Sequence, residues 1–319
     1  MQRRSLIAML ATLPGTAIAQ QPGTWRAATE YPAGAMPAEA LLRLKAALLP
    51  IEVEALFDAP EGVRSAAMPQ AVASSRFAIG DAFAGALGGL DPLFLLSSLP
   101  FLATSAAEAR RLLDAARPAY AAALARQGVS LLCAVPWPAT GLWSRRPVAT
   151  PEDLRGLRVR SYDATGTATM LALGAEAEML SFQDVAARLS AGTLDAVMSS
   201  GDGGAGRRLW EHLPHFTEIG YAMPVSLDFA DPRRLAALDA PGRAALDSAV
   251  AAVEEDLWRL LETRDAANQR RMRENGVTIA APGAGLLAAL RGAGGAAVSA
   301  WETQAGASGQ AVLARYRAG

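Results

Sequence analysis

The chain has 319 residues, of which 51% are hydrophobic and 19% are charged, and its formal net charge is −1. This length and apolar content suffice for two domains with substantial cores. The near-neutral charge excludes a basic nucleic-acid-binding surface, because neutralising phosphates requires clustered cations. One cysteine and two histidines exclude an intrachain disulfide and a thiol-rich metal site.

The first residues contain the three parts of a secretory signal peptide in order. Arg3 and Arg4 precede an apolar run, and Ala17 and Ala19 form a small-residue cleavage motif. We expect cleavage after about Ala19, which removes residues 1–19 and leaves a periplasmic protein. The paired arginines also fit a loose twin-arginine signal, so the export route stays open. No later run is long enough to predict a membrane span.

The first part of the mature chain alternates strands and helices. We expect strands at 25–30, 51–57 and 77–83, with helices at 36–49 and 63–74 between them. This order predicts a parallel sheet whose ligand-facing loops lie at the carboxyl ends of the strands.

Four side chains fall at the carboxyl ends of these strands. Glu30 and Tyr31 follow the first strand, and Asp81 and Phe83 end the third. Because such strand ends face the ligand crevice, we predict that all four contribute to a binding site. Asp81 could instead cap the following turn.

The middle of the chain leads to a proline-rich passage. Segment 90–101 is apolar but contains two prolines, which favours a buried loop or a short helical turn over a strand. A helix is expected at 106–127 and a strand at 129–135. The passage 136–147, rich in proline, tryptophan and glycine, is predicted to cross between two lobes.

Residues 151–201 repeat the alternating pattern and predict a second lobe. The expected strands are 157–161, 176–181 and 194–199, and the expected helices are 164–173 and 182–191. The loop 199–204 then follows the third strand.

Arg160 ends the first strand of this lobe, where a parallel sheet presents cations to a ligand. It could also be a structural ion-pair residue, and Arg158 on the same strand face is interpreted as a surface cation. Ser199 and Ser200 could hydrogen-bond a ligand or cap the following helix.

The last third is mostly helical. Helix 205–212 precedes extended chain at 215–229, which is interpreted as a strand crossing back to the first lobe. Segment 241–275 predicts one helix of about 45 Å, long enough to brace two lobes. The remaining expected elements are a strand at 277–280 and helices at 283–291 and 296–316.

Three tryptophans and two histidines are further candidates for site residues. Trp143 and Trp210 could wall a cleft for an apolar or aromatic ligand or could simply be core, and Trp137 favours the core. His212 and His215 flank Pro214 with no cysteine nearby, so no metal site is predicted. No phosphate-binding loop is present, and no cofactor is predicted.

Taken together, the chain resembles the extracytoplasmic solute receptors of TRAP transporters (tripartite ATP-independent periplasmic transporters) of the dicarboxylate (DctP) type. The order and spacing of several short motifs carry this resemblance, which covers nearly the whole mature chain: ATEYP at 28–32, GDAF at 80–83, LSSLPF at 96–101, PWP at 136–138, GLW at 141–143, DLRGLRVR at 153–160, LGA at 173–175, LSAGTLDA at 189–196, SSG at 199–201 and WE at 210–211.

The resemblance implies an α/β, two-lobe periplasmic-binding-protein fold with crossing hinge strands and a long helix spanning both lobes. It implies that Arg160 pairs with a ligand carboxylate, a role suited to a planar, permanently charged guanidinium. A second arginine near Thr140, a tyrosine after Ser200 and a lysine after Pro224, present in many relatives, are missing here. We therefore favour a monocarboxylate with an apolar or aromatic body.

These observations predict a division of the chain and a function. Residues 20–137 and 224–250 are expected in the first lobe, and residues 138–223 and 251–319 in the second. The predicted function is that of a TRAP solute receptor, not an enzyme, which binds a small organic acid in the cleft and delivers it to a membrane permease. A periplasmic enzyme acting on a small carboxylate is the alternative, although no G-x-S-x-G turn supports it.

Overall fold

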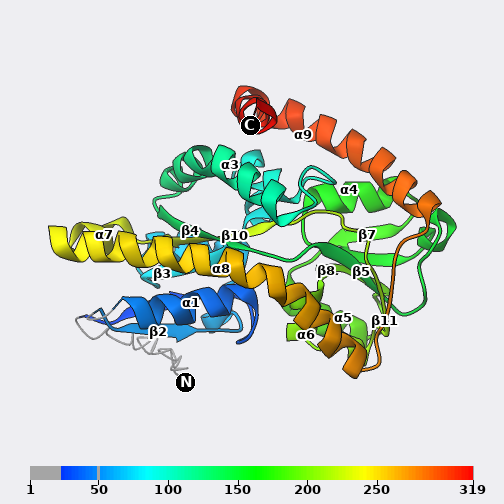
Figure 1. Ribbon diagram of the computed structural model, residues 1–319, viewed down its shortest axis with the longest axis horizontal. Coiled ribbons are helices and arrows are strands. Elements are labelled where there is room, and N and C mark those ends of the chain that lie inside the picture. Colours follow the sequence, from blue (N-terminus) through cyan, green and yellow to red (C-terminus); the bar gives the residue numbers. More distant parts are fainter. Residues whose placement is uncertain (1–22, 49–50, 319) are drawn as a thin grey trace, which may run out of the picture.

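The structure is a computed structural model that describes residues 23–48 and 51–318. The predicted signal peptide, residues 1–19, lies outside the described residues. The predicted α/β class and two-lobe architecture are confirmed, since the strands form two separate sheets with helices around each of them (Figure 1).

The first lobe contains a five-stranded sheet in the order β2-β1-β3-β10-β4. β1 runs parallel to β2 and β3, whereas β10 lies antiparallel between β3 and β4. The strands are β1 Trp25–Ala28, β2 Val53–Leu56, β3 Ile79–Phe83, β4 Ser130–Pro136 and β10 Val225–Ala230.

The second lobe contains a six-stranded sheet in the order β11-β9-β5-β8-β6-β7. β6 runs parallel to β7 and β8, β5 is antiparallel to β8 and β9, and β11 is parallel to β9. The strands are β5 Thr140–Ser144, β6 Arg158–Ser161, β7 Glu176–Met179, β8 Ala196–Ser200, β9 His215–Thr217 and β11 Thr278–Ala280.

Helices surround both sheets, and short 3-10 turns connect them. The helices are α1 Met36–Ala47, α2 Met68–Ala73, α3 Ala106–Arg126, α4 Ala164–Ala172, α5 Phe182–Ser190, α6 Gly201–Gly206, α7 Pro232–Ala236, α8 Ala240–Glu274 and α9 Ala284–Ala318. The 3-10 turns are η1 Pro60–Gly62, η2 Ser65–Ala67, η3 Ala84–Leu87, η4 Pro92–Ser98, η5 Pro151–Leu154 and η6 Leu209–Glu211.

Two chain segments cross between the lobes side by side. Residues 137–139 connect β4 to β5, and residues 218–224 connect β9 to β10. The segments are hydrogen-bonded to each other, from Trp137 N to Pro224 O (3.0 Å) and from Thr140 N to Ala222 O (2.8 Å). The predicted proline-rich crossing is therefore only three residues long, because β5 begins at Thr140.

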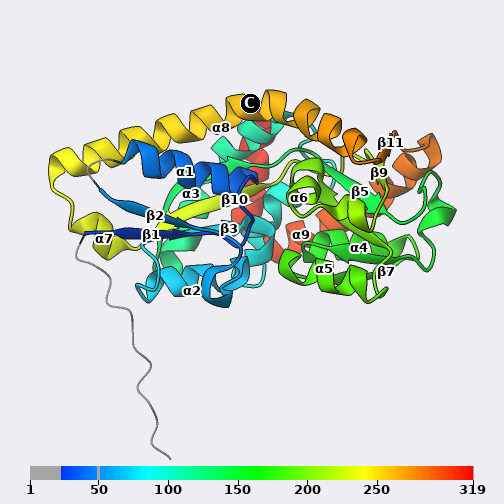
Figure 2. The same ribbon diagram turned by 90° about the horizontal axis from the view of Figure 1, so that it is seen from below.

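α8 is the third connection and runs along both lobes (Figure 2). Its 35 residues give it a length of about 52 Å. It packs on α1 and β4 in the first lobe and on α6 in the second. The prediction of one long helix spanning both lobes is confirmed, and Asp239 caps it by accepting a hydrogen bond from Gly242 N.

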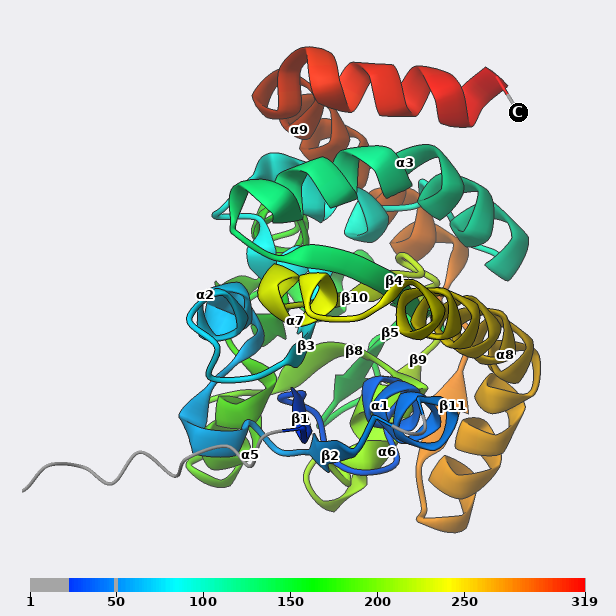
Figure 3. The ribbon, with the colours of Figure 1, turned by 90° about the vertical axis from the view of Figure 1, so that its left-hand side faces the viewer.

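α9 differs from the two separate helices predicted for the C-terminal region. Helical structure continues through residues 292–295, and the helix axis breaks instead at Gly306, whose φ of 57° and ψ of −148° suit a residue without a Cβ. The part after the break lies beside α3 of the first lobe (Figure 3).

This course of α9 departs from the expected assignment of residues 251–319 to the second lobe. The Trp301 indole donates to Pro92 O, and Arg315 donates to Ala115 O (2.9 Å). Both acceptors belong to the first lobe, so the end of the chain extends that lobe's core.

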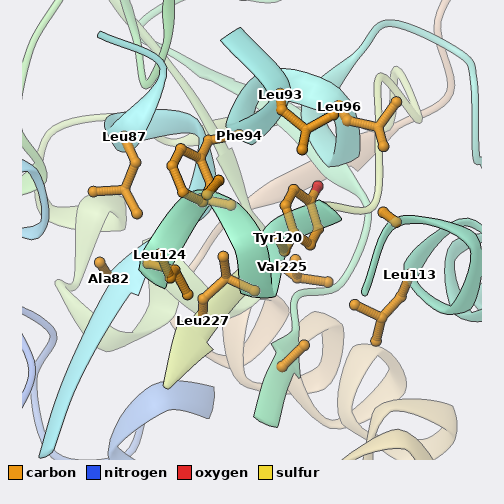
Figure 4. Packing of buried hydrophobic residues seen from close by; sticks show 14 of the residues in the cluster. Ala82, Leu87, Leu93, Phe94, Leu96, Leu113, Tyr120, Leu124, Val225 and Leu227 are labelled. Atoms are coloured by element: carbon orange, nitrogen blue, oxygen red, sulfur yellow. The ribbon is translucent and has the colours of Figure 1, made fainter. Parts of the chain in front are cut away.

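The first lobe's main core lies between its sheet and α3. In Figure 4 the side chains of β3, β10, η4 and α3 interdigitate. Phe94 stacks on Tyr120 with ring centroids 5.9 Å apart. Gly80 lies against α2 so closely that an added Cβ would be 2.6 Å from Met68 Cγ, which explains a glycine in this buried strand.

Candidate functional site

A pocket of about 350 Å³ lies between the two lobes, at the carboxyl ends of strands β3, β6 and β8 and against the crossing segments. The lining residues are Tyr31, Phe83, Trp137, Thr140, Arg160, Tyr162, Phe182, Ser199, Ser200, Gly203 and Pro224.

Arg160 supplies the charge of this pocket. Its side chain is 4% exposed, and backbone carbonyls hold it from two sides. Nε donates to Leu180 O (2.8 Å) and Nη1 donates to Met198 O (3.0 Å). Nη2 has no hydrogen-bond partner among the described residues. Burial lowers the pKa of Arg160, but an arginine keeps its charge at any physiological pH.

Aromatic rings surround the guanidinium. Its Cζ lies 5.2 Å from the centre of the Phe182 ring and 6.0 Å from that of Tyr162, distances at which a cation is attracted to the ring face. Phe83 meets Tyr162 edge-on at 5.1 Å. The pocket therefore combines one cation with flat apolar walls, and its lining contains no carboxylate.

Neutral hydroxyl groups complete the lining. Within the described chain the Ser199 hydroxyl has no hydrogen-bond partner, which leaves it available to a ligand. The Tyr162 hydroxyl and Thr140 Oγ1 are 3.1 Å apart. Burial raises the pKa of both Tyr31 and Tyr162 well above the usual value for a phenol, so both remain neutral hydrogen-bonding groups.

Ser200 has a structural role as well as a place in the lining. Its Oγ accepts a hydrogen bond from Gly203 N (3.1 Å) and caps α6. The predicted loop 199–204 is consequently much shorter, since α6 already begins at Gly201. A serine at this N-cap satisfies one of the free amide groups of the first helical turn.

Glu30 does not line the pocket but joins the two lobes beside it. Its Oε2 accepts from Ser65 N (2.5 Å) in the first lobe, and its Oε1 accepts from Ser181 Oγ (3.2 Å) in the second. Its backbone oxygen accepts from Gln183 Nε2 (3.2 Å) and Arg207 Nη2 (3.1 Å), also from the second lobe.

Further contacts hold the two lobes together. Arg64 of the first lobe and Asp184 of α5 form two hydrogen bonds of 2.5 and 2.7 Å. Asp202 of α6 accepts from Met36 N at the start of α1 (3.0 Å), and Asn268 of α8 also donates to it (3.1 Å).

The other predicted site residues lie away from the pocket. Asp81 is fully buried beneath it and accepts from Thr29 Oγ1 (2.7 Å). Trp143 is fully buried in the second lobe, where its indole donates to Ser200 O (3.3 Å) and its ring packs on Gly204. Trp210 lies beneath Arg271, whose Cζ is 5.2 Å from the ring.

The structure thus brings five predicted residues together and adds others. Tyr31, Phe83, Arg160, Ser199 and Ser200 line the pocket, whereas Glu30, Asp81, Trp143 and Trp210 do not. Tyr162 and Phe182 also line the pocket but were not among the site residues predicted from the sequence. Tyr162 directly follows β6, and Phe182 lies shortly after the end of β7. Tyr31 was selected because it follows the carboxyl end of a strand, and the same rule would have selected both of these residues.

No cluster of potential metal ligands occurs among residues 23–48 and 51–318. Within the same residues, every helix is too short or too polar to cross a membrane.

A fold of two lobes, crossing segments and a cationic pocket between the lobes is typical of a solute-binding protein of the periplasmic type. The sequence matches the model of the family described as "Bacterial extracellular solute-binding protein, family 7" (DctP) over residues 53–304. The chain therefore belongs to this family of extracytoplasmic receptors, which are not enzymes.

Solved structures agree with this assignment. The Bordetella pertussis receptors DctP7 and DctP6, both described as binding pyroglutamic acid, are 28% and 27% identical, with a TM-score of 0.87 for each. The alignments cover 92% and 93% of this chain and 99% and 100% of theirs.

A TRAP solute-binding protein from a marine metagenome, described as specific for pyroglutamate, is 25% identical with a TM-score of 0.86. The alignment covers 93% of this chain and 99% of that one. No curated protein matches the chain.

The chain is thus a solute-binding receptor of the TRAP-transporter type, and the solved relatives are described as binding small carboxylates. The prediction of a receptor is confirmed, and the alternative of a periplasmic enzyme is not supported. Membership of this family places the protein in the periplasm.

Proposed function

We propose that Arg160 anchors the carboxylate of a small, flat monocarboxylate of the pyroglutamate type. The observation that carries the proposal is a single buried guanidinium with a free Nη2 in a small pocket with aromatic walls. A carboxylate would occupy the open side of the guanidinium, where charge-assisted hydrogen bonds are short and strong.

The rest of the lining favours a ligand with one charge and a compact body. A second carboxylate on the ligand would face no second cation in the pocket lining, and burying an unpaired charge costs several kcal/mol. Phe182, Tyr162 and Trp137 are the aromatic side chains against which a planar ring would pack. The ligand's amide or hydroxyl groups would pair with Ser199 and Thr140.

The relatives support this ligand class. The three reported structures with at least 25% identity are each described as binding pyroglutamate or pyroglutamic acid. Pyroglutamate has one carboxylate, which would pair with the single guanidinium, and one flat lactam ring, which would pack on the aromatic lining.

The test is titration calorimetry with L-pyroglutamate on the wild type, Arg160→Ala and Arg160→Lys. Removing one partner of a buried charge pair costs about 2 kcal/mol or more, so we expect Arg160→Ala to weaken binding by at least about 30-fold. Arg160→Lys should recover only part of the loss, because an ammonium cannot match two carboxylate oxygens. Circular dichroism controls for folding, and near-native affinity in Arg160→Ala would refute the anchor.

A thermal-shift screen of organic acids tests the ligand class separately. We expect cyclic monocarboxylates to stabilise the wild-type protein and dicarboxylates such as malate to leave it unchanged. Stabilisation by dicarboxylates alone would refute the proposed ligand class while leaving Arg160 as a possible anchor.

We further propose that the signal peptide is cleaved after Ala19, on the strength of the Ala17–Ala19 motif. Intact-mass measurement of the exported protein tests this position. The expected mature chain begins at Gln20, and a different N-terminus would refute the proposed site.

A further inference from the structure

Two acidic side chains meet in the first lobe, beneath the pocket but outside it. Asp81 on β3 and Asp228 on β10 are direct partners in the antiparallel ladder, and both are 0% exposed. Such partners project from the same face of the sheet with Cβ atoms about 4.5–5.5 Å apart. The two carboxyl groups are therefore neighbours in a site without water contact.

Each carboxyl group has one paired oxygen and one unpaired oxygen. Thr29 Oγ1 donates to Asp81 Oδ2 (2.7 Å), and Cys133 Sγ donates to Asp228 Oδ2 (3.6 Å). Oδ1 of Asp81 and Oδ1 of Asp228 are both buried and lack a partner among the described residues. Buried polar atoms are rarely left unpaired, and one proton between the two carboxyl groups would satisfy both.

The surroundings favour such a proton. Burial raises the pKa of Asp81 to about 7. Burial, followed by the negative charge of Asp81, raises the pKa of Asp228 well above the usual range. The charged and titratable groups that face the pair are Glu30 and Tyr31 after β1, Cys133 on β4 and Glu254 on α8, with Arg117 and Arg110 of α3 paired to Glu254.

The pair is also connected to two walls of the pocket. Thr29 Oγ1, which donates to Asp81, accepts a hydrogen bond from Tyr31 N (3.2 Å). Trp137 Nε1 donates to Ser226 Oγ (3.0 Å), and Ser226 lies two residues before Asp228 on β10. The Tyr31 and Trp137 rings pack edge to face at 4.8 Å.

We propose that Asp81 and Asp228 share one proton and that this pair positions Tyr31 and Trp137 in the pocket. An ionised, mutually repelling pair would separate β3 from β10 at the point where both strands support the binding site. The positioning role rests on the proposed binding function, whereas the shared proton does not.

The shared proton has a measurable consequence for stability. Unfolded aspartates have a pKa of about 3.9, so above that pH the folded protein holds protons that the unfolded chain has lost. Stability therefore falls as the pH rises from there through the raised pKa values. Each extra proton held by the folded state makes the unfolding equilibrium constant rise about tenfold per pH unit.

Urea unfolding of the ligand-free protein between about pH 5 and 7 tests the proton. Asp228→Asn keeps the shape of the side chain, supplies a permanent donor toward Asp81 and removes at least one linked proton. The unfolding equilibrium constant should rise more steeply with pH in the wild type than in Asp228→Asn. We expect the difference between the two slopes to be a factor of at least about ten per pH unit. Asp247→Asn, on the exposed face of α8, is the charge-matched control and should follow the wild type. Equal slopes for the wild type and Asp228→Asn would overturn the shared proton.

The nuclear magnetic resonance signal of the Trp137 indole N–H tests the positioning role without a ligand. We expect the signal to move in Asp228→Ala, which leaves Asp81 unpaired, and to return to its wild-type position in Asp228→Asn. L-pyroglutamate affinity should fall at least about tenfold in Asp228→Ala and recover in Asp228→Asn.

The outcomes separate the two proposals. An unmoved Trp137 signal and unchanged affinity in Asp228→Ala would overturn the positioning role. If Asp228→Ala does not fold, Asp228→Asn alone tests the positioning role. This variant should keep the wild-type Trp137 signal, so a displaced signal would contradict the positioning role. If L-pyroglutamate does not bind even the wild type, the proposed ligand class fails, while the indole signal and the unfolding slopes still decide the role of the pair.

Discussion

Ser181 offers a way to measure what lobe closure contributes to binding. Its hydroxyl donates to Glu30 Oε1 across the lobes (3.2 Å) and also accepts from Gln183 N (3.3 Å) as the N-cap of α5. Only the first bond depends on closure, because α5 and its cap lie within the second lobe. Ser181→Ala therefore removes one closure contact and one helix cap together.

The two losses appear in different measurements. A hydrogen bond to a charged group contributes about 1.5–3 kcal/mol, and a long, partly exposed one contributes less, so we expect a loss of about 1–2 kcal/mol. This corresponds to a ligand dissociation constant raised about 5- to 30-fold. The lost cap acts on open and closed forms alike and lowers the free energy of unfolding by about 0.5–2 kcal/mol.

Ser105→Ala is the matched control for this experiment. Ser105 caps α3 through Glu108 N (3.3 Å) and makes no contact between the lobes. We expect it to lower stability in urea unfolding while calorimetry shows unchanged ligand affinity. If Ser181→Ala matched this control in both measurements, with a dissociation constant within about twofold of the wild type, the Ser181–Glu30 bond would not contribute to closure.

Two further substitutions have defined outcomes. The first is a double-mutant cycle of Arg64→Ala and Asp184→Ala, in which calorimetry should give a coupling free energy of about 0.2–1 kcal/mol in ligand affinity. The coupling should weaken in high salt, because both side chains are partly exposed. Additive effects would show that the ion pair does not favour closure. Gly204→Ala should lower the free energy of unfolding by about 1–3 kcal/mol, because the new Cβ would lie 2.2 Å from Trp143, and a near-native urea midpoint would contradict the tight packing.

The charged centre of the pocket could be predicted from the sequence because its residues all occur at one kind of position, the carboxyl end of a strand. Arg160, Tyr31 and Ser199 all stand at the carboxyl ends of strands, and the alternation of strands and helices identified those ends. The long helix α8 could be predicted equally well, since its apolar residues recur at helical spacing and no proline follows its first turn.

Side-chain direction was harder to predict. Trp143 and Thr140 both belong to β5 and differ in position by an odd number, so they point to opposite faces of the sheet. Thr140 faces the pocket, whereas Trp143 packs on Gly204 and Phe216. Which face meets the pocket depends on how the two sheets are placed, and the strand's own sequence contains no such information.

The break in α9 was misplaced for a related reason. The glycines at 292 and 294–295 indicated a helix end, but Gly294 instead allows α9 to approach Pro100, where a Cβ would lie 2.7 Å from the Pro100 Cβ. The break occurs at Gly306, whose positive φ is tolerated without strain. Local glycine content cannot distinguish close packing from a change of direction.

The contacts of Arg160 indicate how the two lobes divide the work of recognition. Both carbonyls that hold it, from Leu180 and Met198, belong to the second lobe, so this lobe orients the guanidinium before closure. Tyr31 and Phe83 belong to the first lobe and line the pocket from the opposite side. If Arg160 anchors the ligand as proposed, the carboxylate binds first to a preorganised cation, and the body of the ligand is selected on closure. Because Leu180 precedes Ser181, the Arg160 guanidinium and the Glu30 contact between the lobes are linked through one peptide. With Arg160 as the proposed anchor, this peptide would couple ligand binding to the closed form.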